Sequence, residues 1–168
     1  MRVARSLRAG IVVAVAAAVG GCGSGSSPAV ADRTDWPMYR GDAAGTGYSS
    51  LAEVTRANVA ELTEAWRHSL EASPQAGAEA SAPNSQATPI VVGEVMYLPV
   101  ADAIVALDPT DGTELWRHSV AGDNLTRRGV SHWAGNEAEA PRIFFMAGSQ
   151  LGALEAGTGA PVETFGSG

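Results

Sequence analysis

The sequence predicts an all-β protein that forms part of a β-propeller, and two observations predict it. Short β-branched runs separated by turn residues fill the stretch 89–119, as in a meander of antiparallel strands. The sequence Ala-Leu-Asp at 106–108 is also matched 47 positions later by Ala-Leu-Glu at 153–155. A repeat of about 40 to 50 residues with four strands per unit is typical of propeller blades. We therefore expect a partial β-propeller of about one to two blades.

The predicted strands of the first unit are four apolar runs of four to six residues. Their β-branched and aromatic side chains favour strands. The runs are PIVV (89–92), VMYLPV (95–100), AIVALD (103–108) and ELWRHS (114–119). The last turn is specified most closely. Asp108 can cap it, Pro109 fits an early turn position, and Gly112 supplies a positive φ where the chain reverses.

The segments on either side of these strands have other patterns. Residues 35–51 hold aromatic side chains and glycines without periodicity, so we expect an ordered loop. Apolar spacing at 54–62 predicts a short helical turn, and weak alternation at 63–70 predicts a strand. The remaining text predicts loops at 71–85 and 121–141 and strands within 142–148 and 150–165.

The text TEAWRHS returns 50 positions later as TELWRHS. A large flat side chain on an outer strand can wedge between neighbouring blades and anchor its N–H. Trp66 and Trp116 are therefore predicted to be structural residues. We expect Trp66 to pack against a last blade that lies outside the chain. His68 and His118 could be metal ligands, but no Cys or clustered carboxylates stand at ligand spacing. We interpret both histidines as strand-end residues.

Residues 1–22 are predicted to be a lipoprotein signal peptide. Three arginines precede an apolar run of 11 residues, which is too short to span a bilayer as a mature helix. Small residues then lead to Cys22, the only cysteine, which would carry lipid and anchor the chain to a membrane. An ordinary secretory signal cut near Ala29–Ala31 is the alternative. The Gly/Ser/Pro-rich stretch 23–34 is predicted to be a flexible tether.

The charge of the chain excludes one class of partner. Its formal net charge is -7, and three of its 11 basic residues precede Cys22. The part that follows Cys22 is therefore still more acidic. Because an acidic protein is repelled by phosphate backbones, we expect no nucleic-acid binding.

Several segments resemble the pyrroloquinoline quinone (PQQ)-dependent dehydrogenases, especially the membrane-bound glucose and quinate type and its relatives. The resemblance spans residues 35–168. The segment ALDPTDGTELW is similar to the family's tryptophan-docking repeat, with Asp111 at the usual Thr. The opening DWPMYRGDAAGTGYSSL and the later RRGVSHW are more specific to the dehydrogenases.

The resemblance implies an eight-bladed quinoprotein propeller that faces the periplasm, with PQQ and calcium on its axis. It also implies oxidation of a sugar, polyol or alcohol, with electrons passed to a quinone or cytochrome. One blade takes about 40–45 residues, so 168 residues are expected to be an N-terminal fragment. The family's calcium ligands and catalytic Asp are expected beyond residue 168. No catalytic residue or metal ligand is therefore assigned within the chain.

Two positions can be transferred from the family residue by residue. Arg128, in RRGVSHW, matches the arginine that binds the edge of PQQ. PQQ carries carboxylates and an ortho-quinone, and a planar guanidinium can form paired hydrogen bonds with either. Gln86 matches a position beside PQQ that is commonly Glu, and it keeps an acceptor oxygen but loses the charge. Without the family, Arg128 would be interpreted as a surface-loop arginine beside Arg127.

The sequence is also compatible with a second function. An outer-membrane assembly lipoprotein also has a lipid-modified Cys and PQQ-like propeller repeats, but it binds protein partners and no cofactor. The signal peptide fits this scaffold. The opening segment and RRGVSHW favour the enzyme, because a scaffold has no use for an arginine on the propeller axis. A carbohydrate-binding propeller rests on fold analogy alone.

The isolated chain of 168 residues is predicted to be poorly folded and inactive. The strand at 63–70 would pair with a last blade outside the chain, which leaves an open sheet edge. Circular dichroism of the purified chain during heating should therefore show no cooperative transition at high temperature. A sharp transition at high temperature would contradict this prediction.

Overall fold

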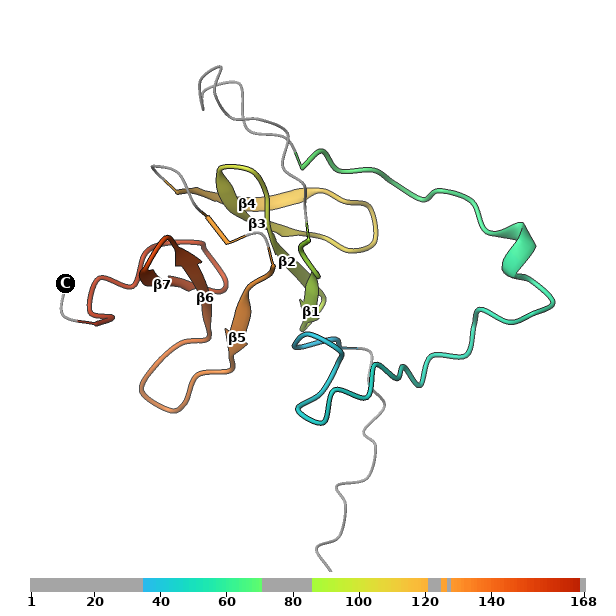
Figure 1. Cartoon of the computed structure of the whole chain (residues 1–168), viewed down its shortest axis with the longest axis horizontal. Coiled ribbons are helices and arrows are strands. Elements are labelled where there is room, and N and C mark those ends of the chain that lie inside the picture. The colour runs from blue at the N-terminus through green and yellow to red at the C-terminus, as the bar shows by residue number, and fades with distance from the viewer. Residues whose placement is uncertain (1–34, 71–85, 121–124, 127, 167–168) are drawn as a thin grey trace, which may run out of the picture. The chain divides into compact units, whose positions relative to one another are not determined.

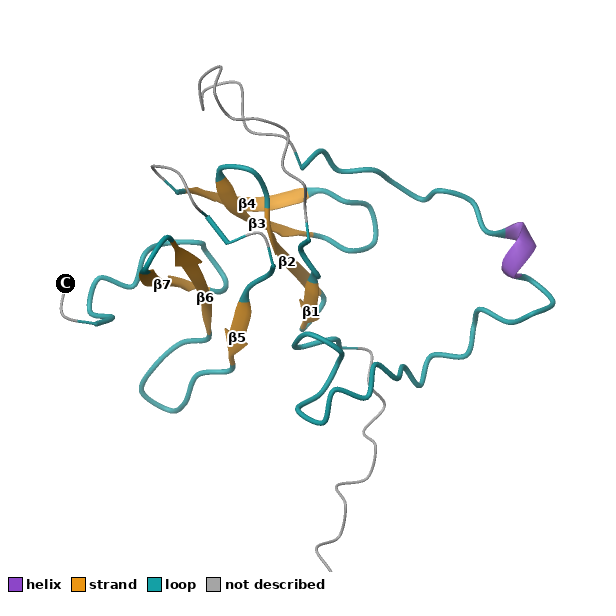
Figure 2. Cartoon of the chain, in the orientation of Figure 1, coloured by secondary structure: helices purple, strands orange, loops and turns teal. Residues whose placement is uncertain are grey.

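The computed structural model describes residues 35–70, 86–120, 125–126 and 128–166. They contain two antiparallel β-sheets (Figure 1 and Figure 2). The predicted signal peptide with Cys22, the tether at 23–34, the loop at 71–85 and Arg127 lie outside the described residues. No helix in the described part is long and apolar enough to cross a membrane. The all-β prediction is confirmed, because within the described ranges the only other regular element is a 3-10 turn, η1 (Val59–Glu61).

The first sheet is a four-stranded antiparallel meander in the order β1-β2-β3-β4 (Figure 1). Its strands are β1 (Ile90–Val92), β2 (Val95–Pro99), β3 (Ala103–Leu107) and β4 (Glu114–Ser119). They agree with the four predicted runs to within one residue. Gly93 and Glu94 join β1 to β2 with φ of 55° and 67°, as a type I′ hairpin turn requires. The sheet is the four-stranded unit that the sequence predicted.

The second sheet has the order β5-β6-β7 within the described residues. Its strands are β5 (Ser131–Trp133), β6 (Arg142–Ala147) and β7 (Gln150–Glu155). Strands β6 and β7 lie where they were predicted. Strand β5 corrects the prediction of a loop over 121–141, because its three residues pair with β6. A strand this short shows no alternation that the sequence could reveal.

The two sheets repeat each other at the spacing of 47 residues seen in the sequence. Tyr97 pairs with Ala106 in the first sheet, and Phe144 pairs with Ala153 in the second. Each of these residues has its counterpart 47 positions away. The repeat in the amino-acid sequence is therefore also a repeat in the register of the paired strands.

The turn that ends β3 is repeated at the end of β7. The Gly112 N–H donates a hydrogen bond to the Asp108 carbonyl at 2.9 Å, and the Gly159 N–H donates to the Glu155 carbonyl at 2.8 Å. The Asp108 carboxylate caps its turn by accepting from the Thr110 hydroxyl and N–H at 2.6 and 2.8 Å. These hydrogen bonds lower the pKa of Asp108. The predicted capping of this turn is confirmed.

The segment ahead of the first sheet is ordered without regular strands. Trp36 and Val91 exchange backbone hydrogen bonds of 2.8 and 2.9 Å, which places the opening loop against β1. The predicted helical turn is η1, and none of its residues is buried. The strand predicted at 63–70 is absent, because these residues form no ladder with any described strand. The Leu70 carbonyl only accepts a hydrogen bond of 3.2 Å from the N–H of Ala101.

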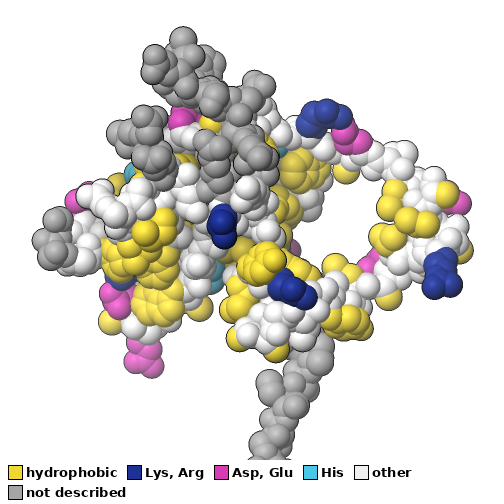
Figure 3. Space-filling view, in the orientation of Figure 1, with side chains coloured by type: hydrophobic (Ala, Val, Ile, Leu, Met, Phe, Trp, Pro, Cys, Tyr) yellow, Lys and Arg dark blue, Asp and Glu magenta, His cyan; other side chains and the backbone are white. Residues whose placement is uncertain are grey.

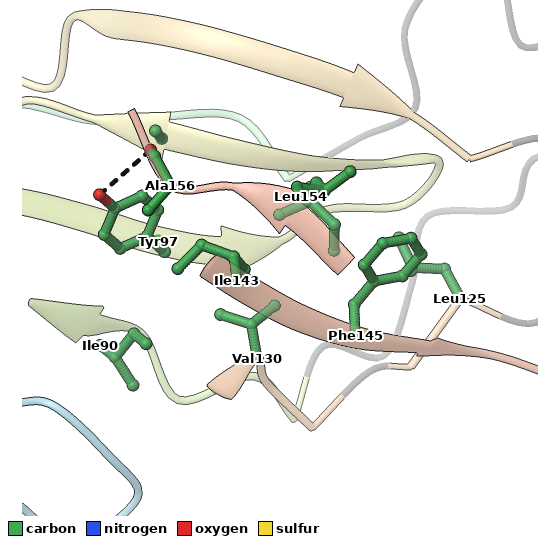
Figure 4. Close-up of a cluster of buried hydrophobic side chains, with 10 residues drawn as sticks. Ile90, Tyr97, Leu125, Val130, Ile143, Phe145, Leu154 and Ala156 are labelled. Atoms are coloured by element: carbon green, nitrogen blue, oxygen red, sulfur yellow. Dashed lines mark hydrogen bonds between the residues drawn. The ribbon is translucent and has the colours of Figure 1, made fainter. Parts of the chain in front are cut away.

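The main hydrophobic core lies between the two sheets (Figure 4). Ile104 from the first sheet and Ile143 and Leu154 from the second are fully buried in it. Burial of each such side chain contributes about 1.5–3 kcal/mol. The Tyr97 hydroxyl donates a hydrogen bond of 3.3 Å to the Ala156 carbonyl across this core. Burial also raises the pKa of Tyr97.

A second hydrophobic cluster covers the opposite face of the first sheet. Leu98, Val105 and Leu107 are buried there, with Trp66 and Leu70 packed against them. The first sheet is therefore covered on both faces by the described part of the chain. This explains why strand β3 is buried at every position.

The outer face of the second sheet is covered only in part within the described residues, by Phe165 packing on Phe144. Met146 and Leu151 are 41% and 53% exposed, and hydrophobic side chains are visible over β6 and β7 in Figure 3. Leu151 stands 47 positions after Ile104, which is fully buried in the core between the sheets. The exposed face of the second sheet thus corresponds to the face of the first sheet that packs on its neighbour.

Trp66 docks onto the turn that joins β3 to β4. Its Nε1–H donates a hydrogen bond to the Pro109 carbonyl at 3.0 Å. Its ring covers Gly112, where an added Cβ would lie 2.5 Å from Trp66 Cε3. This corrects the expectation that the Trp66 side chain packs against a last blade outside the chain. Its side chain is engaged by the first sheet, because the docking surface belongs to the unit that follows the tryptophan.

Trp116, on β4, docks onto the second sheet with the same geometry. Its Nε1–H donates a hydrogen bond to the Ala156 carbonyl at 3.0 Å. Its ring covers Gly159, where an added Cβ would lie 2.5 Å from Trp116 Cε3. Pro109 and Ala156 are equivalent positions 47 residues apart, as are Gly112 and Gly159. Each indole therefore fastens one segment of the chain to the turn of the next sheet.

The substitution Gly112→Ala should destabilise the fold more than Gly93→Ala does. Both glycines have positive φ, which costs alanine about 1–2 kcal/mol. Only Gly112 also meets an indole ring, whereas a Cβ at Gly93 meets nothing within 4 Å. Overpacking adds about 1–3 kcal/mol. Urea denaturation of the gene product that contains this chain should show the difference in the free energy of unfolding, and equal losses would contradict the docking role.

Candidate functional site

The two residues predicted to bind a cofactor each stand just ahead of the first strand of a sheet. Gln86 lies four positions before β1, and Arg128 lies three positions before β5. The structure brings these two lead-in segments together, because the Thr88 N–H donates a hydrogen bond to the Arg128 carbonyl at 3.3 Å. Gln86 and Arg128 therefore belong to neighbouring segments, although 42 positions separate them in the sequence.

Gly129 allows the two lead-in segments to approach closely. Its φ is 139°, and an added Cβ would lie 3.2 Å from the Thr88 carbonyl oxygen. Glycine alone adopts such a φ without strain. Ile90 and Val130 follow on the two segments, and both are buried in the core between the sheets. We call the contact of Thr88 with Arg128 and Gly129 the lead-in bracket.

The Arg128 side chain is exposed, and its guanidinium makes no hydrogen bond or ion pair with the described residues. Its main-chain N–H donates to Thr126 Oγ1 at 3.4 Å. Gln86, on the neighbouring segment, is also exposed. A guanidinium offers five N–H donors in a planar fork. An exposed Arg with an amide side chain on the next segment suits a ligand that carries carboxylate and quinone oxygens.

His132, on β5, packs between the two sheets. Its ring stacks on Tyr97 with 6.5 Å between centroids and 20° between planes. Burial lowers the pKa of His132, and the charge of Asp35 partly opposes this shift. The Asp35 carboxylate accepts a hydrogen bond of 3.2 Å from the Gly93 N–H. Sequence reasoning assigned His132 no role, and its place in RRGVSHW was the only available signal.

A cluster of charged side chains links the Trp66 segment to the first sheet. Arg117 donates two hydrogen bonds to the Glu114 carboxylate at 2.7 and 3.0 Å. Asp102 lies 3.8 Å from Arg117, and His68 Nε2 lies 3.9 Å from Glu114. The hydrogen bond with Glu114 raises the pKa of Arg117. The histidine of the first WRHS copy thus faces the glutamate that precedes the second copy.

The described residues contain no group of three or more His, Cys, Asp or Glu side chains that could hold a metal ion. The two histidines of the repeated WRHS sequence have different neighbours: His68 faces Glu114, whereas the ring of His118 lies 6.1 Å from that of Phe145. Calcium therefore stays an expectation from the family, and no ligand for it is assigned among the described residues.

The fold and the site together define a class of protein. The chain contains a four-stranded antiparallel meander whose strand register and final turn recur 47 residues later in a three-stranded sheet. It docks tryptophans on glycine turns and presents an arginine ahead of the second sheet. These are features of a quinoprotein β-propeller. The chain belongs to that family, because residues 36–168 match the PQQ family of glucose, ethanol and alcohol dehydrogenase β-propeller domains.

Individual relatives agree with the family assignment. The chain is 32% identical over 139 residues to the quinohemoprotein alcohol dehydrogenase of Comamonas testosteroni. This match covers 76% of this chain and 18% of that protein. It is 33% identical over 119 residues to quinoprotein glucose dehydrogenase A of Acinetobacter calcoaceticus, which covers 65% of this chain and 14% of that protein. The crystal structure of the Comamonas enzyme matches 76% of this chain with a TM-score of 0.61 and 31% identity. The chain spans less than a fifth of the length of these relatives.

Acidification from pH 7.5 to pH 5.5 should destabilise the fold. Burial lowers the pKa of His118, which a hydrogen bond with the Gly159 backbone partly opposes, and burial likewise lowers the pKa of His132. The unfolded chain therefore binds more protons than the folded chain below about pH 6.5. Stability is present above that pH and is lost as the pH falls.

Urea denaturation of the gene product that contains this chain at several pH values measures this loss. The double substitution His118→Gln and His132→Gln should flatten the dependence of unfolding free energy on pH. Carboxylates stay ionised across this range, so they do not obscure the result. A dependence that is equally steep in the double variant would contradict the assignment.

Proposed function

We propose that the gene product that contains this chain is a PQQ-dependent dehydrogenase that oxidises an alcohol, polyol or sugar. Family membership over residues 36–168 supports this proposal. The observation that carries it in the structure is the lead-in bracket, because it joins the segments of the two predicted cofactor residues. This chain would supply one side of the cofactor site, and the residues that act on the substrate are expected elsewhere in the gene product.

The chemistry of the available donors fits PQQ. The Arg128 guanidinium is exposed and has no partner among the described residues, so it can bind a carboxylate or quinone oxygen at both edges of its fork. The Gln86 amide can donate and accept a hydrogen bond on the neighbouring segment. When bound, PQQ supplies the quinone that accepts the electrons, and calcium supplies a Lewis acid. The role of this chain is to bind and orient the cofactor.

The electron acceptor and the location belong to the same proposal. A quinone or a cytochrome is the proposed acceptor, and one relative is named 1-butanol dehydrogenase (cytochrome c). The proposed location is the periplasmic side of a bacterial membrane, with a lipid on Cys22 as anchor. The charged start, the apolar run of 11 residues and the small residues before Cys22 support this location.

The activity is tested by loading the purified gene product with PQQ and Ca²⁺. Reduction of an artificial electron-acceptor dye is then followed with a panel of primary alcohols, polyols and aldoses. Turnover of at least one class is expected, and activity should move from the membrane fraction to the soluble fraction in the Cys22→Ala variant. No PQQ binding and no dye reduction with any member of the panel would overturn the proposal.

The substitution Arg128→Ala should weaken PQQ binding. Loss of a charge-assisted contact costs about 1.5–3 kcal/mol, so the dissociation constant should rise about 10- to 160-fold. The PQQ affinity of Arg128→Lys should lie between those of the unsubstituted protein and Arg128→Ala, because Lys keeps the positive charge but lacks the planar guanidinium. Arg67→Ala is the matched control, since Arg67 is 80% exposed and pairs with Glu64. Titration of the apo gene product with PQQ measures the effect, and equal affinities for the Arg128→Ala and Arg67→Ala variants would contradict it.

A further inference from the structure

We propose that Gly129 is a positioning residue that sets the Arg128 guanidinium against PQQ through the lead-in bracket. This inference rests on the proposed function, because it needs Arg128 to bind the cofactor. Gly129 itself has no side chain and touches no ligand. Its effect must therefore act through the backbone of Arg128 and Thr88.

Position 129 requires glycine for two reasons. A φ of 139° lies in a region that side chains rarely occupy. A Cβ would also lie 3.2 Å from the Thr88 carbonyl oxygen, which is a backbone atom and cannot rotate away as a flexible side chain could. Any substitution at Gly129 must therefore change its own backbone conformation or push Thr88 away.

The lead-in bracket cannot lengthen much without losing its hydrogen bond. The hydrogen bond from the Thr88 N–H to the Arg128 carbonyl is already 3.3 Å long, just beyond the usual range for an N–H···O hydrogen bond. The N–H and the carbonyl of Thr88 thus face Arg128 and Gly129 respectively. A shift that relieves a new Cβ at Gly129 would break this hydrogen bond and separate the two segments.

The Arg128 side chain receives no support from other described side chains. Its guanidinium has no hydrogen bond or ion pair with the described residues. The side chain is long and loses considerable rotamer freedom when it is fixed. Because the described residues offer it no side-chain support, its reach is set by the position of its own backbone. The bracket fixes that position relative to the segment that carries Gln86.

The experiment compares Gly129→Ala with Gly148→Ala in the gene product that contains this chain. Gly148 also has a positive φ, of 58°, but a Cβ there meets nothing within 4 Å. It therefore controls for replacing a positive-φ glycine that has no close contact, and the strain specific to a φ of 139° belongs to the effect under test. PQQ affinity is measured by titration of the apo protein, and stability is measured by thermal unfolding of the same samples. Gly129→Ala should weaken PQQ binding about ten-fold, whereas Gly148→Ala should leave affinity unchanged.

A double-mutant cycle with Arg128→Ala tests whether Gly129 acts through Arg128. In the Arg128→Ala background, Gly129→Ala should have no further effect on PQQ affinity. A purely structural glycine would lower the unfolding temperature in either background without changing affinity, and that result would overturn the inference. Additive losses of affinity would overturn it too, because they would show that Gly129 acts independently of Arg128.

A second variant keeps the test open if Gly129→Ala does not fold. Thr88→Pro removes the N–H donor of the bracket and leaves Gly129 in place. Pro89 already restricts Thr88 to extended conformations, which proline can adopt. Thr88→Pro should also weaken PQQ binding, and unchanged affinity would overturn the inference. If the unsubstituted protein binds no PQQ, the proposed function itself fails. If it binds PQQ and only Arg128→Ala weakens binding, the function stands and the role of Gly129 fails.

Discussion

The rest of this fold depends on an indole ring seated on a glycine turn. Trp66 covers Gly112 and Trp116 covers Gly159, and in each case an added Cβ would lie 2.5 Å from the ring. Glycine is required at both turns for two independent reasons, because each also has a positive φ, of 75° and 71°. Each indole donates its N–H to a backbone carbonyl, so its polar edge is satisfied while its apolar surface is covered. One short repeat thus encodes both a backbone conformation and a binding surface.

This docking determines where the candidate site forms. The Trp116 N–H and the Tyr97 hydroxyl both donate to the Ala156 carbonyl, at 3.0 and 3.3 Å. Two side chains of the first sheet therefore hold one backbone group of the second, which has a lone pair for each. With the sheets fixed in this way, the segments that lead into β1 and β5 meet at Thr88 and Arg128. The segments of the two predicted cofactor residues are thus aligned by contacts that involve neither side chain.

The strands and turns of the first sheet could be predicted from sequence because their signals are local. Alternation, β-branching and the text around Asp108 and Gly112 each act within a few residues. Strand β5 could not be predicted, since three residues carry no periodicity and only pairing with β6 makes them a strand. The partner of Trp66 was missed because docking joins positions 43 residues apart. Arg128 and Gln86 came from resemblance, and their neighbourhood depends on a backbone hydrogen bond that no side-chain pattern records.

The docking of the tryptophans is also directional, and it leaves the outer face of the second sheet without an indole. Trp66 precedes the first sheet and docks on its turn, while Trp116 belongs to the first sheet and docks on the second. In the second sheet, the residue that donates its N–H to Ala153 is Val162, at 2.9 Å, where the first sheet pairs Trp116 with Ala106. The described part of the second sheet therefore receives an indole but carries none on the corresponding segment. Among the described residues this outer face is covered in part by Phe165, whose ring lies 5.3 Å from that of Phe144, while Leu151 stays exposed.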